Sequence, residues 1–444
     1  MGRLGRREFL LGGVAAAGRS RPNVLVLLPD QWRGMDLGCM GNREVRTPHF
    51  DRLAAQGVAF RNSIANCPVC TPARSILLTG RFAHTTGTGV NDVPLANEVV
   101  TIAEVLKEQG YRTGFIGKWH LEGGKRQPGF VPPGPRRQGF DYWAATICDH
   151  NYFKSHYFRD SPEPIPIPRY DALEYTDRAI EFLGQDTRRP FCLYVQWGPP
   201  HNPYVAPPEF LRQYDPGRLT LRPNWREGTR LGSRQDLAGY YAAVTCIDHE
   251  AGRILEALDR NGQADNTIVL VTSDHGDMLG SHGKSLKRKP WEESIRVPGI
   301  VRYPAGIRRN GRSDLLFSHV DVVPTLLGLC GVAGPPGMQG RDLSPHLTGR
   351  RAAEPESVYL QIYTKSEEGE FAPWRGVRTK RYTYARFAER FWVLYDNEQD
   401  PYQMRNLAGR SEHQAVEARL DRMVRDWFAR TGDHWDEQYD RPFR

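Results

Sequence analysis

Short runs of apolar residues recur along the first three quarters of the chain, and each run ends in a polar loop. These runs are too short for typical helices, and they show no alternation of apolar and polar positions. Continuous apolar runs of this length are typical of strands that are buried on both faces, as in parallel sheets. The clearest examples are residues 23–28, 111–117, 190–197 and 267–272, with shorter extended segments at 58–60 and 297–302.

Helical periodicity occupies the stretches between these runs. Strands that alternate with helices predict an α/β fold, with a mainly parallel central sheet sandwiched by helices. Gly- and Pro-rich stretches at 123–140 and 160–169 predict loops, and 205–232 is expected to be irregular. The predicted helices cover residues 47–56, 101–109, 171–183, 236–260 and 321–329.

The pattern changes after about residue 350. Short extended runs separated by turns predict a small antiparallel sheet, followed by a helix over 412–429. The predicted organisation is therefore a leader at 1–20, a catalytic α/β domain at 21–350 and a smaller C-terminal subdomain at 351–444. The extended runs are 358–363, 374–380, 382–385 and 391–395.

Composition indicates a globular protein, since the 444 residues are 39% hydrophobic and 25% charged. The net charge of +8 is not arranged as a basic stripe with interleaved aromatic residues, so we expect no nucleic-acid partner. A polyanion such as a sulfated glycan suits this charge equally well. Seven cysteines without regular spacing do not indicate a disulfide scaffold, and no apolar run is long enough to span a bilayer.

The N-terminal residues resemble an export signal. Arg6 and Arg7 are followed by Phe9 and a short, weakly apolar stretch, as in twin-arginine (Tat) signals, and 15–17 offers a small-residue cleavage region. The sequence thus predicts export, to the periplasm. The alternative is a basic leader on a cytoplasmic protein.

Polar side chains follow several of the predicted strands. Asp30 and Gln31 follow the first strand, and Asp274 and His275 follow a later one. An acid at such a place is as often a helix N-cap as a ligand, but carboxyl ends of parallel strands share one sheet edge, where ligands bind. Asp and Gln oxygens suit a hard divalent cation, with calcium the first expectation and magnesium the second.

Residues 67–81 form the most distinctive stretch of the sequence. Thr71 is predicted to cap a helix with Pro72 at its first position, and Gly80 is predicted to close it. Cys70 would then lie just before the first turn, where free N–H groups favour an anion or a nucleophile. Spacing alone leaves a redox pair with Cys67, half of a zinc site, and plain structural cysteines as open alternatives.

The run Cys70-Thr-Pro-Ala-Arg74, followed by Thr79-Gly80, resembles the signature of the formylglycine-dependent sulfatases. With the strand-end motifs, the resemblance extends over residues 23–408. It implies an alkaline phosphatase-like fold and hydrolysis of sulfate esters, of carbohydrates above all. It also implies that a maturation enzyme oxidises Cys70 to formylglycine. Cys67 lacks the proline two residues later and is not the implied target.

The resemblance also implies a role for each strand-end residue. A cation would be held by Asp30, Gln31, Asp274, His275 and the modified residue 70, although Asp is more usual than Gln at position 31. Arg74 would support these ligands. The residues implied to contact the sulfate, the aldehyde hydrate or the leaving oxygen are Lys118, His120, His201 and Lys287.

In the implied mechanism, one hydroxyl of the aldehyde hydrate attacks sulfur and the alcohol leaves with a proton from His201. The second hydroxyl then expels sulfate. Two other functions stay open. A formylglycine-dependent phosphonate monoester or phosphodiester hydrolase also tends to carry a stretch like 30–33, although the pair Lys118 and His120 argues for sulfate. A non-catalytic glycan-binding protein would keep Cys70 as a thiol.

The remaining histidines receive no role, His84, His249 and His282 among them. Of these, His282 is the first candidate to line the pocket.

Overall fold

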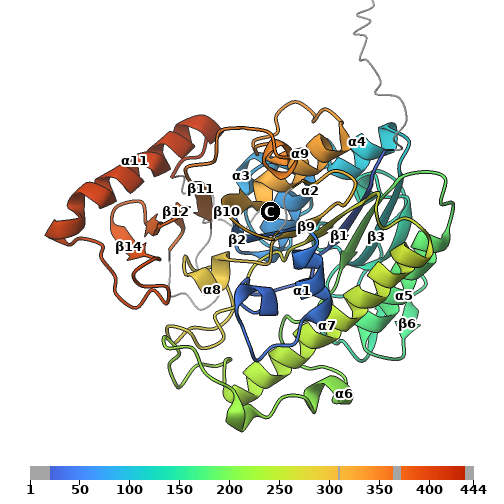
Figure 1. Ribbon diagram of the computed structural model, residues 1–444, viewed down its shortest axis with the longest axis horizontal. Coiled ribbons are helices and arrows are strands. Elements are labelled where there is room, and N and C mark those ends of the chain that lie inside the picture. The colour runs from blue at the N-terminus through green and yellow to red at the C-terminus, as the bar shows by residue number, and fades with distance from the viewer. Residues whose placement is uncertain (1–20, 309–310, 364–371, 436–444) are drawn as a thin grey trace, which may run out of the picture.

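The computed structural model describes residues 21–308, 311–363 and 372–435, so the predicted export leader lies outside the described residues. Within them, a large sheet has the strand order β10-β2-β9-β8-β1-β7-β3-β4 (Figure 1). Strand β9 is antiparallel to both its neighbours, and every other pairing in the sheet is parallel. The prediction of a mainly parallel α/β sheet is confirmed. The strands are β1 (Asn23–Leu27), β2 (Val58–Ile64), β3 (Arg112–Lys118), β4 (Tyr142–Thr146), β7 (Phe191–Gln196), β8 (Thr267–Val271), β9 (Ile300–Arg302) and β10 (Gly311–Ser318).

Helices cover both faces of this sheet, which explains the continuous apolar runs (Figure 1). Alternate residues of β1 enter different cores: Leu25 and Leu27 pack on one face, and Val24 and Val26 pack on the other. Helices α1 (Pro48–Ala55), α5 (Asp171–Gly184) and α7 (Arg234–Arg260) cover the first face. Helices α2 (Cys70–Thr79), α4 (Ile102–Glu108) and α9 (His319–Cys330) cover the second.

A second, four-stranded sheet of order β11-β12-β13-β14 is antiparallel throughout, as predicted. Helix α11 (Gln414–Thr431) packs against it, and the rings of Tyr359 and Trp427 stack with centroids 5.6 Å apart. Figure 1 shows this unit at one end of the molecule. The strands are β11 (Val358–Ile362), β12 (Trp374–Arg378), β13 (Tyr382–Arg386) and β14 (Phe391–Asp396).

Smaller elements lie in the connections. The predicted loop at 160–169 contains β6 (Ile165–Ile167), which pairs with β5 (Ser155–Tyr157). The short α-helices are α3 (Ala83–Thr86), α6 (Pro208–Leu211), α8 (Glu292–Ile295) and α10 (Ser344–Leu347), and the 3-10 helices are Gly38–Met40, Pro135–Arg137, Pro216–Arg218 and Ser411–His413. None of the helices in the described part of the chain has both the length and the apolar character that a membrane span requires.

The predicted start of helix α2 is wrong. The helix begins at Cys70, and Val69 is its N-cap residue, without a side-chain hydrogen bond. Thr71 does not cap because its hydroxyl donates to the carbonyl of His120 (2.9 Å) and accepts from the backbone N–H of Asp92 (3.3 Å). The Thr71 hydroxyl, which the N-cap preference predicted to cap the helix, is used instead in contacts with distant segments. Gly80 closes the helix in the left-handed conformation, as predicted.

Candidate active site

The predicted site residues meet at the carboxyl edge of the large sheet. Asp30 follows β1, Lys118 ends β3, His201 lies beyond β7, and Asp274 lies just beyond β8. The first turn of α2 brings Cys70 to the same edge. Residues that are distant in sequence are thus adjacent because parallel strands all end on one side.

Asp30, Cys70, Asp274 and His275 form a buried cluster whose candidate ligand atoms all lie within 4.8 Å of one another. The Oδ1 atom of Asp30 has no hydrogen-bond partner in the described structure, although it is fully buried. A buried carboxylate oxygen without a partner is costly, and a cation would remove that cost.

His275 offers the cluster a nitrogen ligand. Its Nδ1 lies 3.0 Å from the carbonyl oxygen of Gly276 and must carry the proton, because a carbonyl only accepts. In the neutral ring, the form that binds a cation, Nε2 has the free electron pair and lies 3.3 Å from Cys70 Sγ. The two carboxylates and this imidazole fit a divalent cation.

Gln31 lies beside the cluster but is engaged elsewhere. Its backbone N–H donates to Asp274 (3.0 Å), its amide nitrogen donates to Asp277 (2.7 Å), and its Oε1 accepts from Lys287 Nζ (2.9 Å). These partners fix the orientation of the amide. Its assignment as a metal ligand stays a prediction. Asp277, which also accepts from Tyr204 (2.6 Å), was not predicted, although it lies only three residues after Asp274.

Arg74 holds the two acids together. Its Nη2 donates to Asp30 (3.1 Å) and to Asp274 (3.0 Å), and its Nη1 donates to the Lys118 carbonyl (2.8 Å) and to the Gln196 side chain. The side chains of Arg74, Asp30 and Asp274 are fully buried. A planar guanidinium can bridge two carboxylates in this way, whereas a lysine offers one point charge.

The charges around the two acids differ. Burial raises the pKa of Asp30, but the charges of Lys118 and Arg74 outweigh it and hold that pKa well below its usual range. Lys118 Nζ lies only 2.5 Å from Asp30 Oδ2. Burial and the neighbouring charge of Asp30 raise the pKa of Asp274. A bound dication would favour the ionised form of both acids.

Cations also face residue 70. Burial raises the pKa of the Cys70 thiol, but Lys287 and Lys118 outweigh it and lower that pKa well below its usual range. Cys67 lies instead in the apolar cluster that includes Tyr359 and Trp374, and burial raises its pKa to about 12. The two cysteines thus occupy different environments and do not form a joint redox or zinc site.

Lys287 and His201 form a hydrogen-bonded pair above the cluster. Lys287 Nζ lies 2.9 Å from His201 Nε2, and His201 Nδ1 lies 2.8 Å from the Asn202 carbonyl oxygen. His201 is therefore neutral, with its proton on Nδ1. Burial and the charge of Lys287 hold the pKa of His201 well below its usual range.

His150 is a site residue that sequence reasoning missed. Its ring stacks on that of His201, with centroids 4.2 Å apart and an interplanar angle of 3°, and its Nε2 lies 3.4 Å from Lys118 Nζ. The only sequence signal was its position after β4, and that strand was not predicted.

His120 is held by Asp92. Its Nε2 lies 2.9 Å from Asp92 Oδ1, and Arg126 pairs with the same carboxylate (2.8 Å). In the neutral ring the carboxylate accepts the Nε2 proton and leaves a free electron pair on Nδ1, a buried atom that has no partner among the described residues.

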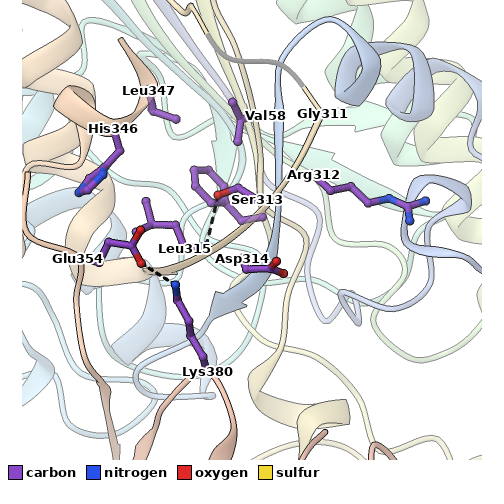
Figure 2. Close-up of a pocket in the computed structure, with 11 residues that line it drawn as sticks. Val58, Gly311, Arg312, Ser313, Asp314, Leu315, His346, Leu347, Glu354 and Lys380 are labelled. Atoms are coloured by element: carbon purple, nitrogen blue, oxygen red, sulfur yellow. Dashed lines mark hydrogen bonds and ion pairs between the residues drawn. The ribbon is translucent and has the colours of Figure 1, made fainter. Parts of the chain in front are cut away.

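Another pocket lies away from these residues. A cavity of about 270 Å³ lies against strand β10, and none of the predicted site residues lines it. Figure 2 shows its lining residues. Its Lys380 and Glu354 pair with each other at 2.5 Å. His282 lies elsewhere too, stacked on Trp291 (4.8 Å) and 3.0 Å from the Asn224 amide.

Comparison with protein families shows to which family this chain belongs. The model of the sulfatase family matches residues 22–332, well over half of the chain. This chain belongs to the sulfatase family. The model of the C-terminal region of N-sulphoglucosamine sulphohydrolase also matches residues 280–429.

Named relatives and solved structures agree with this assignment. An ulvan-active sulfatase from Formosa agariphila is 38% identical over 424 residues, which cover 94% of this chain and 83% of that protein. The YidJ structure from Bacteroides fragilis has a TM-score of 0.86 and 32% identity, covering 97% of this chain and all of that one. A solved complex with its substrate D-glucosamine-2-N,6-O-disulfate has a TM-score of 0.84 and 26% identity, covering 94% and 99%. The sequence-based prediction of a sulfatase enzyme is confirmed.

Proposed function

We propose that this sulfatase removes sulfate from carbohydrate sulfate esters, using a formylglycine that a maturation enzyme makes from Cys70. We further propose that Asp30, Gln31, Asp274, His275 and residue 70 hold a divalent cation, calcium before magnesium. One observation carries the proposal: Cys70 lies in a buried cluster with two acids and a histidine, and two lysines face it. The sulfated substrates named for its relatives support the carbohydrate assignment.

The charged residues of the site would have different catalytic roles. When present, the hydrated aldehyde and its cation supply an oxygen nucleophile. Lys118 and Lys287 are placed to bind the sulfuryl oxygens and to neutralise the charge that develops on them. The free Nδ1 of His120 is suited to accept a proton.

The leaving alcohol needs a proton, and the hydrogen bonds of His201 bear on which group would give it. His201 alone has no proton on Nε2, because that atom accepts from Lys287. The Lys287–His201 pair shares one transferable proton between Nζ and Nε2. We therefore assign the acid role to this pair and not to His201 by itself.

Two measurements test the proposed function. kcat/KM for 4-nitrophenyl sulfate should exceed that for an aryl phosphodiester, and a higher value for the diester would favour the phosphonate or phosphodiester alternative. Mass spectrometry of the peptide that contains Cys70 should show the aldehyde. Unmodified thiol throughout, in protein from the native host, would favour the glycan-binding alternative.

Chelation of the cation should lower both activity and stability. At a cation concentration of 100 times its Kd, the loss of binding removes about 2.7 kcal/mol of unfolding free energy. EDTA is expected to reduce turnover of 4-nitrophenyl sulfate by at least about 100-fold. Activity and melting temperature should return with Ca²⁺, and less completely with Mg²⁺. Asp274→Asn is the control, because its melting temperature should no longer respond to EDTA. A wild type indifferent to EDTA would contradict the cation site.

Asp92→Asn should lower kcat without loss of the fold. The Asn amide can donate to His120 Nε2 and place the ring proton on Nδ1, which then no longer accepts. We expect kcat to fall about 10- to 100-fold, part of the contribution of a positioned base, with little change in KM. Arg126→Gln is the matched control, since it keeps the Asp92 carboxylate. Wild-type kcat in the Asp92 variant would show that His120 needs no such partner.

A further inference from the structure

His150 is the residue of the site that neither the sulfatase motifs nor the proposed mechanism uses. It lies four residues beyond the end of β4 and is half-buried. Its ring lies parallel to that of His201, and Lys118 faces its Nε2. It is thus built into the wall of the site between the residues proposed to bind the sulfate and to protonate the leaving group.

The contacts of His150 fix where its proton lies. The Lys118 ammonium only donates, so the Nε2 atom 3.4 Å from it accepts. Burial and the charge of Lys118 lower the pKa of His150 to about 3, so the ring is neutral and its proton is on Nδ1. This N–H has no hydrogen-bond partner in the described structure, unlike Nδ1 of His201, which donates to a carbonyl.

The loop that carries His150 is anchored so that this donor stays in place. Tyr152 donates from its hydroxyl to the carbonyl oxygen of His201 (2.9 Å), which ties the loop to the segment after β7. The neighbouring Asp149 is directed to its own loop, where its carboxylate accepts from Ser155 (2.7 Å) and from a backbone N–H (2.9 Å). A fixed donor without a partner costs little to order when a ligand binds.

We propose that His150 positions the substrate by donating from Nδ1 to an oxygen of the sugar. This inference rests on the proposed function. Because its Nε2 lies next to Lys118, the donor is close to the sulfuryl oxygens, and the acceptor would be a hydroxyl or ring oxygen near the ester carbon. The chemical class is a carbohydrate sulfate that has such an oxygen. A simple aryl sulfate has no sugar hydroxyl or ring oxygen there, so His150 selects carbohydrate over aryl esters.

The test compares two substrates in matched variants. His150→Phe keeps a ring against His201 and removes the N–H, whereas His150→Gln keeps an amide donor. For each enzyme, kcat and KM are measured on sulfated ulvan oligosaccharides and on 4-nitrophenyl sulfate. In His150→Phe, the ratio of kcat/KM for the oligosaccharide to that for the aryl ester should fall about 10-fold, mainly through a higher KM for the oligosaccharide. His150→Gln should recover part of that ratio.

The outcomes separate this inference from the proposed function. A wild type that cleaves neither sulfate ester would overturn the proposed function itself, and His150 would lose its role with it. A wild type that cleaves both, with an unchanged ratio in His150→Phe, would overturn only the role of His150. Melting temperatures confirm that each variant folds. His150→Ala provides the same comparison if the phenylalanine does not fit.

Discussion

Replacement of Cys70 by alanine is expected to abolish hydrolysis of sulfate esters, with a loss of at least about 10⁴-fold in kcat. No other side chain in the buried cluster can supply the covalent nucleophile, since Asp30 and Asp274 are held by Arg74. The fold should survive, because among the described residues Cys70 Sγ makes a polar contact only with His275. Turnover of 4-nitrophenyl sulfate and circular dichroism measure the two effects.

Cys67→Ala is the matched control for this variant. Cys67 is also buried, but it packs in the apolar cluster with Tyr359 and Trp374. Its variant should keep the activity and lose only some stability. Cys70→Ser tests the mechanism. A serine has no second hydroxyl that could expel sulfate. One equivalent of alcohol should therefore be released while the serine stays sulfated. Activity in Cys70→Ala comparable to the wild type would refute the assigned nucleophile.

Arg74→Ala should produce the largest loss of stability. Removing one partner of a buried ion pair leaves the other charge uncompensated, which costs about 3–5 kcal/mol. Here two carboxylates lose the same partner, and the Lys118 carbonyl loses a donor. We expect the midpoint of urea unfolding to fall accordingly, and activity to be lost as the two acids separate.

Two further variants make the Arg74 experiment specific. Arg74→Lys keeps the positive charge but lacks the planar guanidinium that bridges both carboxylates, so it should recover only part of the stability. In Arg74→Ala/Asp274→Asn one of the two repelling carboxylates is gone, so the double variant should be less destabilised than the sum of the single variants. Strict additivity would show that Arg74 does not act through Asp274.

The site residues at strand ends were predictable because the carboxyl ends of parallel strands meet at one edge of a sheet. Asp30, Lys118, His201 and Asp274 follow apolar runs, and parallel strands bring their ends to one edge. The edges of the sheet were harder. The first half of β10 is largely exposed, so its residues form no continuous apolar run, and β4 (Tyr-Trp-Ala-Ala-Thr) contains no Val, Ile or Leu. His150, which follows β4, was missed for the same reason.

Contacts between distant segments could not be predicted from local patterns. Gln31 is predicted as a metal ligand, and the contacts of its amide with Lys287 and Asp277 follow from no local pattern. The weakly matched Lys287 nevertheless lies in the site. It sits in a loop in which Leu286 and Arg288 on either side have positive φ angles, a path that no periodicity indicates.

The burial of helix α2 limits when Cys70 can be modified. All ten of its residues, Cys70 and Arg74 included, are buried in the folded chain. If the proposed maturation enzyme binds this segment as an extended peptide, it can reach the segment only before the chain has folded. Protein made in a host without that enzyme would then fold around an unconverted thiol, and later addition of the enzyme would not rescue it.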